Sequence, residues 1–185
     1  MRTLILPMLL VAAAGCGGGP KTYSIAAYSF TVADEGYFTS TGTDLCPNAN
    51  APGQLMLDFV DYDFLCDPKH PPARDKNQAH VEMRIILNIG LPPTYDGNFP
   101  GARTSKPYEV SPGNCTSANG IGSNQAQFLH YGPGDVDADT TVDADSGTVS
   151  ISQFDADKVK PLMGEFDLHF GGKEVKDTFK LFSCN

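Results

Sequence analysis

Residues 79–89 read AHVEMRIILNI, and this stretch decides the fold class. Its odd-numbered positions from 81 to 89 are apolar, and its even-numbered positions are polar except for Ile86. Successive side chains of a strand point to opposite faces, so a period of two is typical of an antiparallel strand with one buried face. We therefore expect His80, Glu82 and Arg84 on the solvent side of a sheet.

The C-terminal third carries the next clearest pattern. Residues 162–170 and 175–181 both alternate apolar with polar side chains, and Gly171-Gly172 lies between them. Two amphipathic strands separated by two glycines predict a β-hairpin with a tight turn. A shorter alternating run at 148–152 predicts a neighbouring strand.

Shorter runs elsewhere predict further strands, at 21–32, 55–59, 108–111 and 125–131. The first run loses its alternation at Ala26-Ala27, which indicates a bulge within one strand. Residues 36–50 and 91–106 are rich in turn-forming residues and are predicted to be loops. Few windows have a helical period, so the fold is predicted to be all-β, an antiparallel two-sheet sandwich. A jelly-roll-like connectivity is one version of it, and a barrel is the alternative.

The composition agrees with this fold and limits the partners. The 185 residues include 19 Gly and 14 Pro, a share that favours turns and loops over helices. Acidic residues outnumber basic ones by 22 to 13, which gives a formal net charge of −9. A chain this acidic is repelled by nucleic acid and by anionic lipid, so we expect neither as a partner.

The first sixteen residues, MRTLILPMLLVAAAGC, have the layout of a secretory signal peptide. The apolar run at 4–14 is too short to span a bilayer. The segment Ala13-Ala14-Gly15-Cys16 resembles the lipobox of bacterial lipoproteins, although Ala13 stands where leucine is usual. The resemblance implies that residues 1–15 are cleaved off, that Cys16 is lipidated, that 16–21 form a tether and that 22–185 form one domain. The alternative is ordinary cleavage after Ala14, which would release a soluble protein.

A lipidated Cys16 would hold the domain at a bacterial cell envelope, because two or more acyl chains anchor a protein stably. By analogy with known lipoproteins, Gly17 directly after this cysteine fits sorting to the outer membrane. We expect a protein or glycan of the envelope as the partner.

Five cysteines are present, and lipidation of one leaves four that can pair completely. The chain has no C-x-x-C spacing, which favours structural disulfides over a metal or redox site. Four cysteines permit three connectivities.

Three C-terminal segments carry a family resemblance: SGTVSI at 146–151, GEFDLHF at 164–170 and DTFKLFSC at 177–184. They resemble the end of a family of uncharacterised bacterial lipoproteins of the myxobacterial type, whose chains show GTV, GxFxLxF and FxxxxC strands. Asp177 departs from that pattern, because the family has glycine there. The resemblance implies a β fold and an envelope location, and no reaction. It also implies that Cys66 pairs with Cys184, which leaves Cys46 to pair with Cys115.

An acidic run offers a candidate metal site. Its carboxylates are Asp135, Asp137, Asp139, Asp143 and Asp145. Ca²⁺ takes six to eight oxygen ligands, and closely spaced carboxylates can supply them. An EF-hand, however, needs glycine and glutamate where Thr140 and Ser146 stand. The other interpretation of the run is a solvated acidic linker.

Signals for catalysis are weak. No H-x-x-x-H or G-x-S-x-G motif occurs. Asp58, Asp61, Asp63 and Glu82 offer a carboxylate pair of the kind used in glycoside hydrolysis, but any acidic chain does so. We therefore expect a binding or structural module. The alternatives are a secreted hydrolase with a site assembled from loops and a Ca²⁺-binding β domain.

Overall fold

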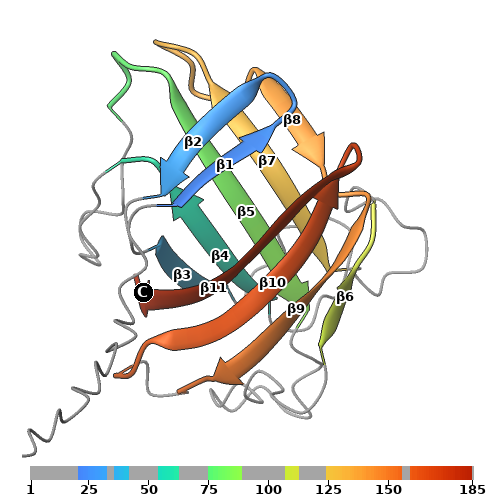
Figure 1. Cartoon of the computed structure of the whole chain (residues 1–185). Coiled ribbons are helices and arrows are strands. Elements are labelled where there is room, and N and C mark those ends of the chain that lie inside the picture. The colour runs from blue at the N-terminus through green and yellow to red at the C-terminus, as the bar shows by residue number, and fades with distance from the viewer. Residues whose placement is uncertain are drawn as a thin grey trace, which may run out of the picture.

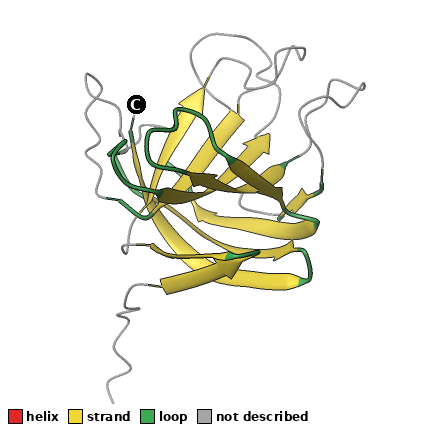
Figure 2. Cartoon of the chain, turned by 90° about the horizontal axis from the view of Figure 1, so that it is seen from above, coloured by secondary structure: helices red, strands yellow, loops and turns green. Residues whose placement is uncertain are grey.

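The computed structural model describes residues 21–32, 36–41, 54–62, 75–88, 107–112, 124–155 and 159–184. These residues form strands and loops without any helix, as Figure 2 shows. The prediction of an all-β, antiparallel sandwich is confirmed. None of the described residues belongs to a helix that could cross a bilayer.

Nine strands form one sheet in the order β6-β9-β10-β11-β3-β4-β5-β7-β8, and β1 and β2 form a separate hairpin (Figure 1). The strands are β1 (Lys21–Ile25), β2 (Tyr28–Val32), β3 (Gly36–Thr41), β4 (Gln54–Val60), β5 (His80–Asn88), β6 (Tyr108–Val110), β7 (Gln125–Tyr131), β8 (Thr140–Asp143), β9 (Ser146–Gln153), β10 (Leu162–Phe170) and β11 (Lys173–Ser183). The sheet folds over, so that β6-β9-β10-β11 packs as one layer on β3-β4-β5-β7-β8.

The two layers are connected along both sides. On one side β11 pairs with β3 in parallel, from Leu181 to Ser183. On the other side the chain passes from one layer to the other at Ala144-Asp145, between β8 and β9. Ala144 donates its N–H to Ala126 of β7, and Asp145 donates its N–H to His169 of β10. The sandwich therefore has the continuity of a barrel, which was the alternative prediction.

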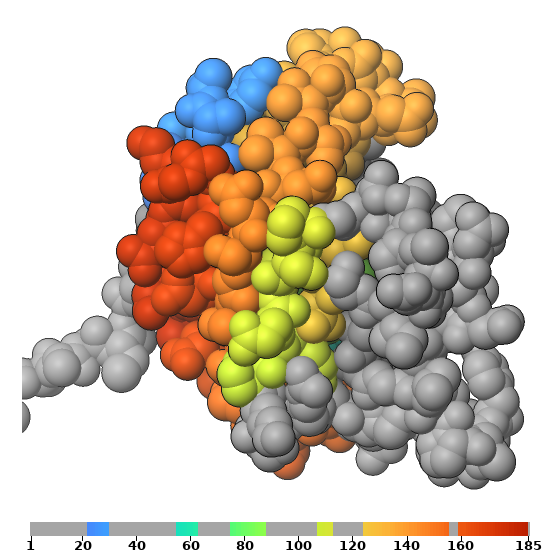
Figure 3. Space-filling view, turned by 90° about the vertical axis from the view of Figure 1, so that its right-hand side faces the viewer, coloured from blue at the N-terminus to red at the C-terminus, as the bar shows by residue number. Residues whose placement is uncertain are grey.

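Strand β6 lies between β9 and the start of β7. It pairs with β9 on one side and bridges Asn124, at the start of β7, on the other. Figure 3 shows β6 lying along β9 on the face turned to the viewer.

Aromatic side chains join the layers in the core. The ring of Phe59 on β4 meets the rings of Phe166 and Phe179 edge to face, with centroids 5.3 and 5.9 Å apart. Phe166 and Phe179 are stacked, 6.3 Å apart, on the neighbouring strands β10 and β11. Such pairs stabilise a core beyond the area that they bury.

The predicted hairpin at the C-terminus is confirmed. Strands β10 and β11 pair from Leu162–Leu181 to Phe170–Lys173, and Gly171 and Gly172 make the turn with φ of 55° and 80°. Both values lie in the left-handed region that glycine adopts without a steric penalty.

The predicted single strand at 21–32 is wrong. The chain reverses at Ala26-Ala27, and β1 pairs with β2 from Lys21–Val32 to Ile25–Tyr28. The loss of alternation marked a turn rather than a bulge. Ala26 adopts φ of 53°, a conformation that an L-residue rarely takes. Glycine or asparagine usually marks such a turn, and neither is present here, so the sequence did not predict it.

Two other strands lie in segments predicted to be loops or linkers. Gly36–Thr41 forms β3 between β11 and β4, and Thr140–Asp143 forms β8 beside β7. Both are rich in threonine and polar residues, which have little apolar alternation to reveal a strand. Pairing with stronger neighbouring strands determines their conformation.

Candidate functional site

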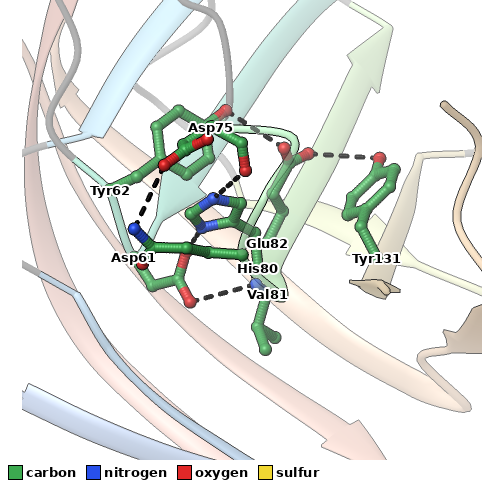
Figure 4. Close-up of polar contacts among 8 residues, drawn as sticks. Asp61, Tyr62, Asp75, His80, Val81, Glu82 and Tyr131 are labelled. Carbon is green, nitrogen blue, oxygen red and sulfur yellow. Dashed lines mark hydrogen bonds and ion pairs between the residues drawn. The ribbon is translucent and has the colours of Figure 1, made fainter. Parts of the chain in front are cut away.

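A group of polar side chains lies on the outer face of β4, β5 and β7 (Figure 4). We call it the outer-face cluster; it consists of Asp58, Asp61, Tyr62, Asp75, His80, Glu82, Arg84 and Tyr131, of which Figure 4 labels all but Asp58 and Arg84. The alternation of β5 places its even-numbered side chains here, opposite the core. The sequence predicted His80, Glu82 and Arg84 on the solvent side, and for His80 and Glu82 this prediction is wrong because both are buried. Asp58, His80 and Glu82 are 0, 7 and 3% exposed.

His80, at the start of β5, forms hydrogen bonds with the segment after β4 and with the segment before β5. Its Nδ1 lies 3.1 Å from Oδ1 of Asp61, and its Nε2 lies 2.9 Å from the carbonyl oxygen of Asp75. Both partners accept hydrogen bonds, so both ring nitrogens must carry protons for both bonds to form. Asp61 also accepts the backbone N–H of Val81. His80 therefore has a structural role, with no nitrogen left for a metal or for general-base catalysis.

Glu82 is surrounded by donors. Tyr62 donates its hydroxyl to Oε1 at 3.1 Å, and Tyr131 donates to Oε2 at 3.3 Å, as Figure 4 shows. Arg84 adds a longer contact to Oε2, at 3.4 Å. Hydrogen bonds to both oxygens stabilise a buried carboxylate in its charged form.

Asp58 has fewer hydrogen-bond donors than Glu82 among the described residues. Its Oδ1 accepts Nε–H of Arg84 at 2.7 Å, whereas Oδ2 is buried and has no hydrogen-bond partner among the described residues. Burial raises the pKa of Asp58 to about 6, against the opposing effect of Arg84. Asp58 and Glu82 together hold the pKa of Arg84 above its usual range, although burial acts the other way.

A second histidine–carboxylate pair lies where β7 ends. His130 Nδ1 lies 2.7 Å from Oδ1 of Asp139, and the backbone N–H of Asp139 donates back to the His130 carbonyl oxygen. The ring of Tyr28 stacks on the imidazole with centroids 4.3 Å apart. The bond from His130 lowers the pKa of Asp139. His130 is partly buried.

The His130–Asp139 pair orients an imidazole as catalytic pairs do. However, no Ser, Thr or Cys side chain in the described part of the chain hydrogen-bonds to that ring. The pair ties the loop of residues 132–139 to β7, and the β1–β2 hairpin covers it.

A solvent-open groove of about 640 Å³ runs between β1 and β11. Its lining is Thr22, Tyr23, Ser24, Lys173, Glu174, Val175, Lys176 and Asp177. No backbone ladder joins the two strands within the described residues. Hydroxyl groups line one side and charges of both signs the other, so the groove suits a polar ligand. None of the histidine–carboxylate pairs lines it.

The five aspartates of the candidate calcium site do not converge. Asp135 accepts the N–H of Gly132, Asp139 binds His130, Asp143 accepts from Gln127, and Asp145 accepts the N–H of Gly171. Asp137 is exposed. No group of three or more His, Cys, Asp or Glu in the described residues is arranged to hold a metal. The geometry therefore does not support the calcium interpretation.

Cys184, directly after β11, is disulfide-bonded. Cys16, Cys46, Cys66 and Cys115 lie outside the described residues, as does Asp63. Lipidation of Cys16 and the pairing of Cys66 with Cys184 stay predictions.

Sequence reasoning missed the groove and the burial of the outer-face cluster. The groove arises from the turn at Ala26-Ala27, which had no recognisable sequence signal. Comparison with known proteins adds no relative: no family model, curated protein or solved structure matches the chain.

Proposed function

We propose that this chain is a lipid-anchored binding module of a bacterial envelope, without enzymatic activity, that engages a polar protein or glycan partner through the groove between β1 and β11. The groove is the observation that carries the proposal. It is open to solvent and lies on a body of paired strands, where a binding surface is held in place by its scaffold.

The polar groups outside the groove support a binding rather than a catalytic role. His80 uses both ring nitrogens, and His130 is paired with Asp139 beneath Tyr28. The carboxylates of Glu82 and Asp145 accept hydrogen bonds within the fold. These groups stabilise the sandwich and its loops.

The proposed tether leads directly into β1, which lines one side of the groove. Residue 21 begins β1, and Cys16, the proposed lipid attachment point, lies five positions before it. We therefore expect the groove to face a partner close to the membrane surface.

The anchor is tested by replacing Cys16 with serine. The wild-type chain should fractionate with membranes and incorporate a labelled fatty acid, and the Cys16→Ser chain should do neither. Wild-type protein that stays in the soluble fraction and carries no labelled fatty acid would contradict the anchor. This result would not bear on the proposal that the groove binds a partner.

The groove is tested by site-specific photo-crosslinking in intact cells. A crosslinking residue at Ser24, in the groove, should give a discrete adduct with one envelope component. The same residue at the exposed Ser152 of β9 is the control and should not. Equal adducts at both positions, or no adduct at Ser24, would reject the groove as the binding site.

A further inference from the structure

Asp58 is a fully buried carboxylate of the outer-face cluster, and one of its two oxygens has no donor among the described residues. Its cationic partner Arg84 also contacts Glu82. A buried carboxylate oxygen without a partner is costly, and the cost is removed by a cation or by a proton.

The hydrogen bonds show which buried carboxylate oxygen lacks a donor. Both oxygens of Glu82 have donors, from Tyr62 and from Tyr131 with Arg84. On Asp58, Oδ1 is bound to Arg84, and Oδ2 has no donor among the described residues. The unsolvated lone pairs therefore lie on Oδ2 of Asp58.

We propose that Asp58 is a proton-binding site of the folded protein: Oδ2 takes up one proton on mild acidification, and the sandwich becomes more stable as it does so. A metal ion fits this position less well, because it needs several oxygen ligands and only one oxygen here is without a partner.

The groups around Asp58 come from β5, β7, β3 and the residues after β4. From β5, Arg84 favours the charged form, and Glu82 disfavours it by like-charge repulsion. From β7 and from the residues after β4, Tyr131 and Tyr62 bind Glu82 rather than Asp58. On β3 the residue opposite Asp58 is Tyr37. Burial outweighs the guanidinium, and the pKa of Asp58 rises to about 6.

The direction of the effect follows from linkage. In the unfolded chain Asp58 has its ordinary pKa of 3.8, so the folded state binds the proton more tightly. The contribution of Asp58 to stability is full below that value and is lost as the pH rises through about 6. Between pH 7.5 and pH 5 the folding equilibrium constant should gain roughly tenfold from this one group.

The experiment compares the full chain in detergent with its Asp58→Asn variant by urea unfolding at several pH values. Every other titratable side chain is common to both proteins, so the difference between the two curves isolates Asp58. The wild type should gain roughly tenfold in its folding constant relative to the variant as the pH falls from 7.5 to 5. Parallel curves would overturn the proposal.

Two further measurements cover the other outcomes. If Asp58→Asn does not fold, carboxyl NMR of the wild type must show one aspartate titrating near pH 6, and Glu82→Gln must move that step to lower pH. The absence of such a step would also overturn the proposal. Added Ca²⁺ or Na⁺ should not stabilise the wild type at pH 7.5 beyond its effect on the variant. A selective effect would assign the position to a cation instead.

Discussion

The hydroxyl of Tyr23 on β1 donates a hydrogen bond to Oδ2 of Asp177 on β11, and Oδ1 of the same carboxylate accepts the backbone N–H of Thr178. The Asp177 side chain thus accepts a backbone N–H of β11 and also binds the β1–β2 hairpin through Tyr23. A charged side chain at a strand edge also discourages pairing with other strands.

Loss of the Tyr23 hydroxyl should loosen the hairpin. We expect Tyr23→Phe to lower the free energy of unfolding by about 1–2 kcal/mol, since a partly buried bond to a charged acceptor is lost. Amide exchange should accelerate in β1 and β2 more than in β10. The matched control is Ser29→Ala, which removes an exposed hydroxyl pair with Ser24 and should have little effect. Uniform acceleration across all strands would contradict a local anchor.

The same tyrosine predicts sensitivity to alkali. Burial raises the pKa of Tyr23 to about 12, from an ordinary value of 10.0. The folded state therefore keeps the phenol proton longer than the unfolded chain does. Its contribution to stability is complete below pH 10 and is lost as the pH rises toward 12. Thermal melts between pH 8 and 11 should fall more steeply for the wild type than for Tyr23→Phe, and equal slopes would refute the assignment.

The turn of the same hairpin should accept glycine. Ala26 has φ of 53°, which costs an L-residue roughly 1–2 kcal/mol and glycine almost nothing. We expect Ala26→Gly to stabilise the protein by about 0.5–1 kcal/mol in urea unfolding, after allowance for the greater freedom of glycine in the unfolded chain. Ala27→Gly is the control and should not stabilise, because Ala27 has no positive φ. A loss of stability in Ala26→Gly would contradict a left-handed conformation of Ala26 at this turn.

The sequence predicts much of the fold because the strong strands alternate cleanly. Val81, Met83 and Ile85 indicated the core face of β5, and Gly171-Gly172 indicated the β10–β11 turn. By contrast, Ala26-Ala27 contains none of the residues that mark turns. The burial of Asp58 and Glu82 could not be predicted either. A period of two assigns polar residues to the opposite face but does not reveal whether that face is solvated.

Contacts between distant segments explain why the partners of the acidic run could not be predicted. The acidic run was interpreted as a calcium loop or a linker from the spacing of its carboxylates alone. In the structure Asp139 and Asp145 bind His130 of β7 and Gly171 of the β10–β11 turn. Spacing along the chain carries no information about these partners.

The His130–Asp139 pair should hold the loop of residues 132–139. We expect Asp139→Asn to speed amide exchange in this loop, because the charge-assisted bond to Nδ1 becomes a weaker neutral one. Asp137→Asn removes a neighbouring exposed charge in the same loop and is the matched control. His130→Phe keeps a ring to stack on Tyr28 and should reproduce the loop effect. Unchanged exchange in both variants would mean that the loop is held by its backbone bonds alone.

Gly164 allows the aromatic packing between β10 and β11. It lies directly opposite Phe179 in the register. A Cβ at position 164 would come within 2.5 Å of the Phe179 ring and 2.2 Å of the Ser150 carbonyl oxygen. Neither neighbour can move freely, because the ring packs on Phe59 and the carbonyl belongs to β9.

We therefore expect Gly164→Ala to destabilise the protein by about 1–3 kcal/mol, the usual cost of overpacking. Urea unfolding measures the loss, and Glu165→Ala on the exposed face of the same strand is the control. A smaller side chain at position 179 should relieve the ring contact, so Gly164→Ala should cost less in a Phe179→Leu background. Equal costs in both backgrounds would assign the whole effect to the Ser150 carbonyl.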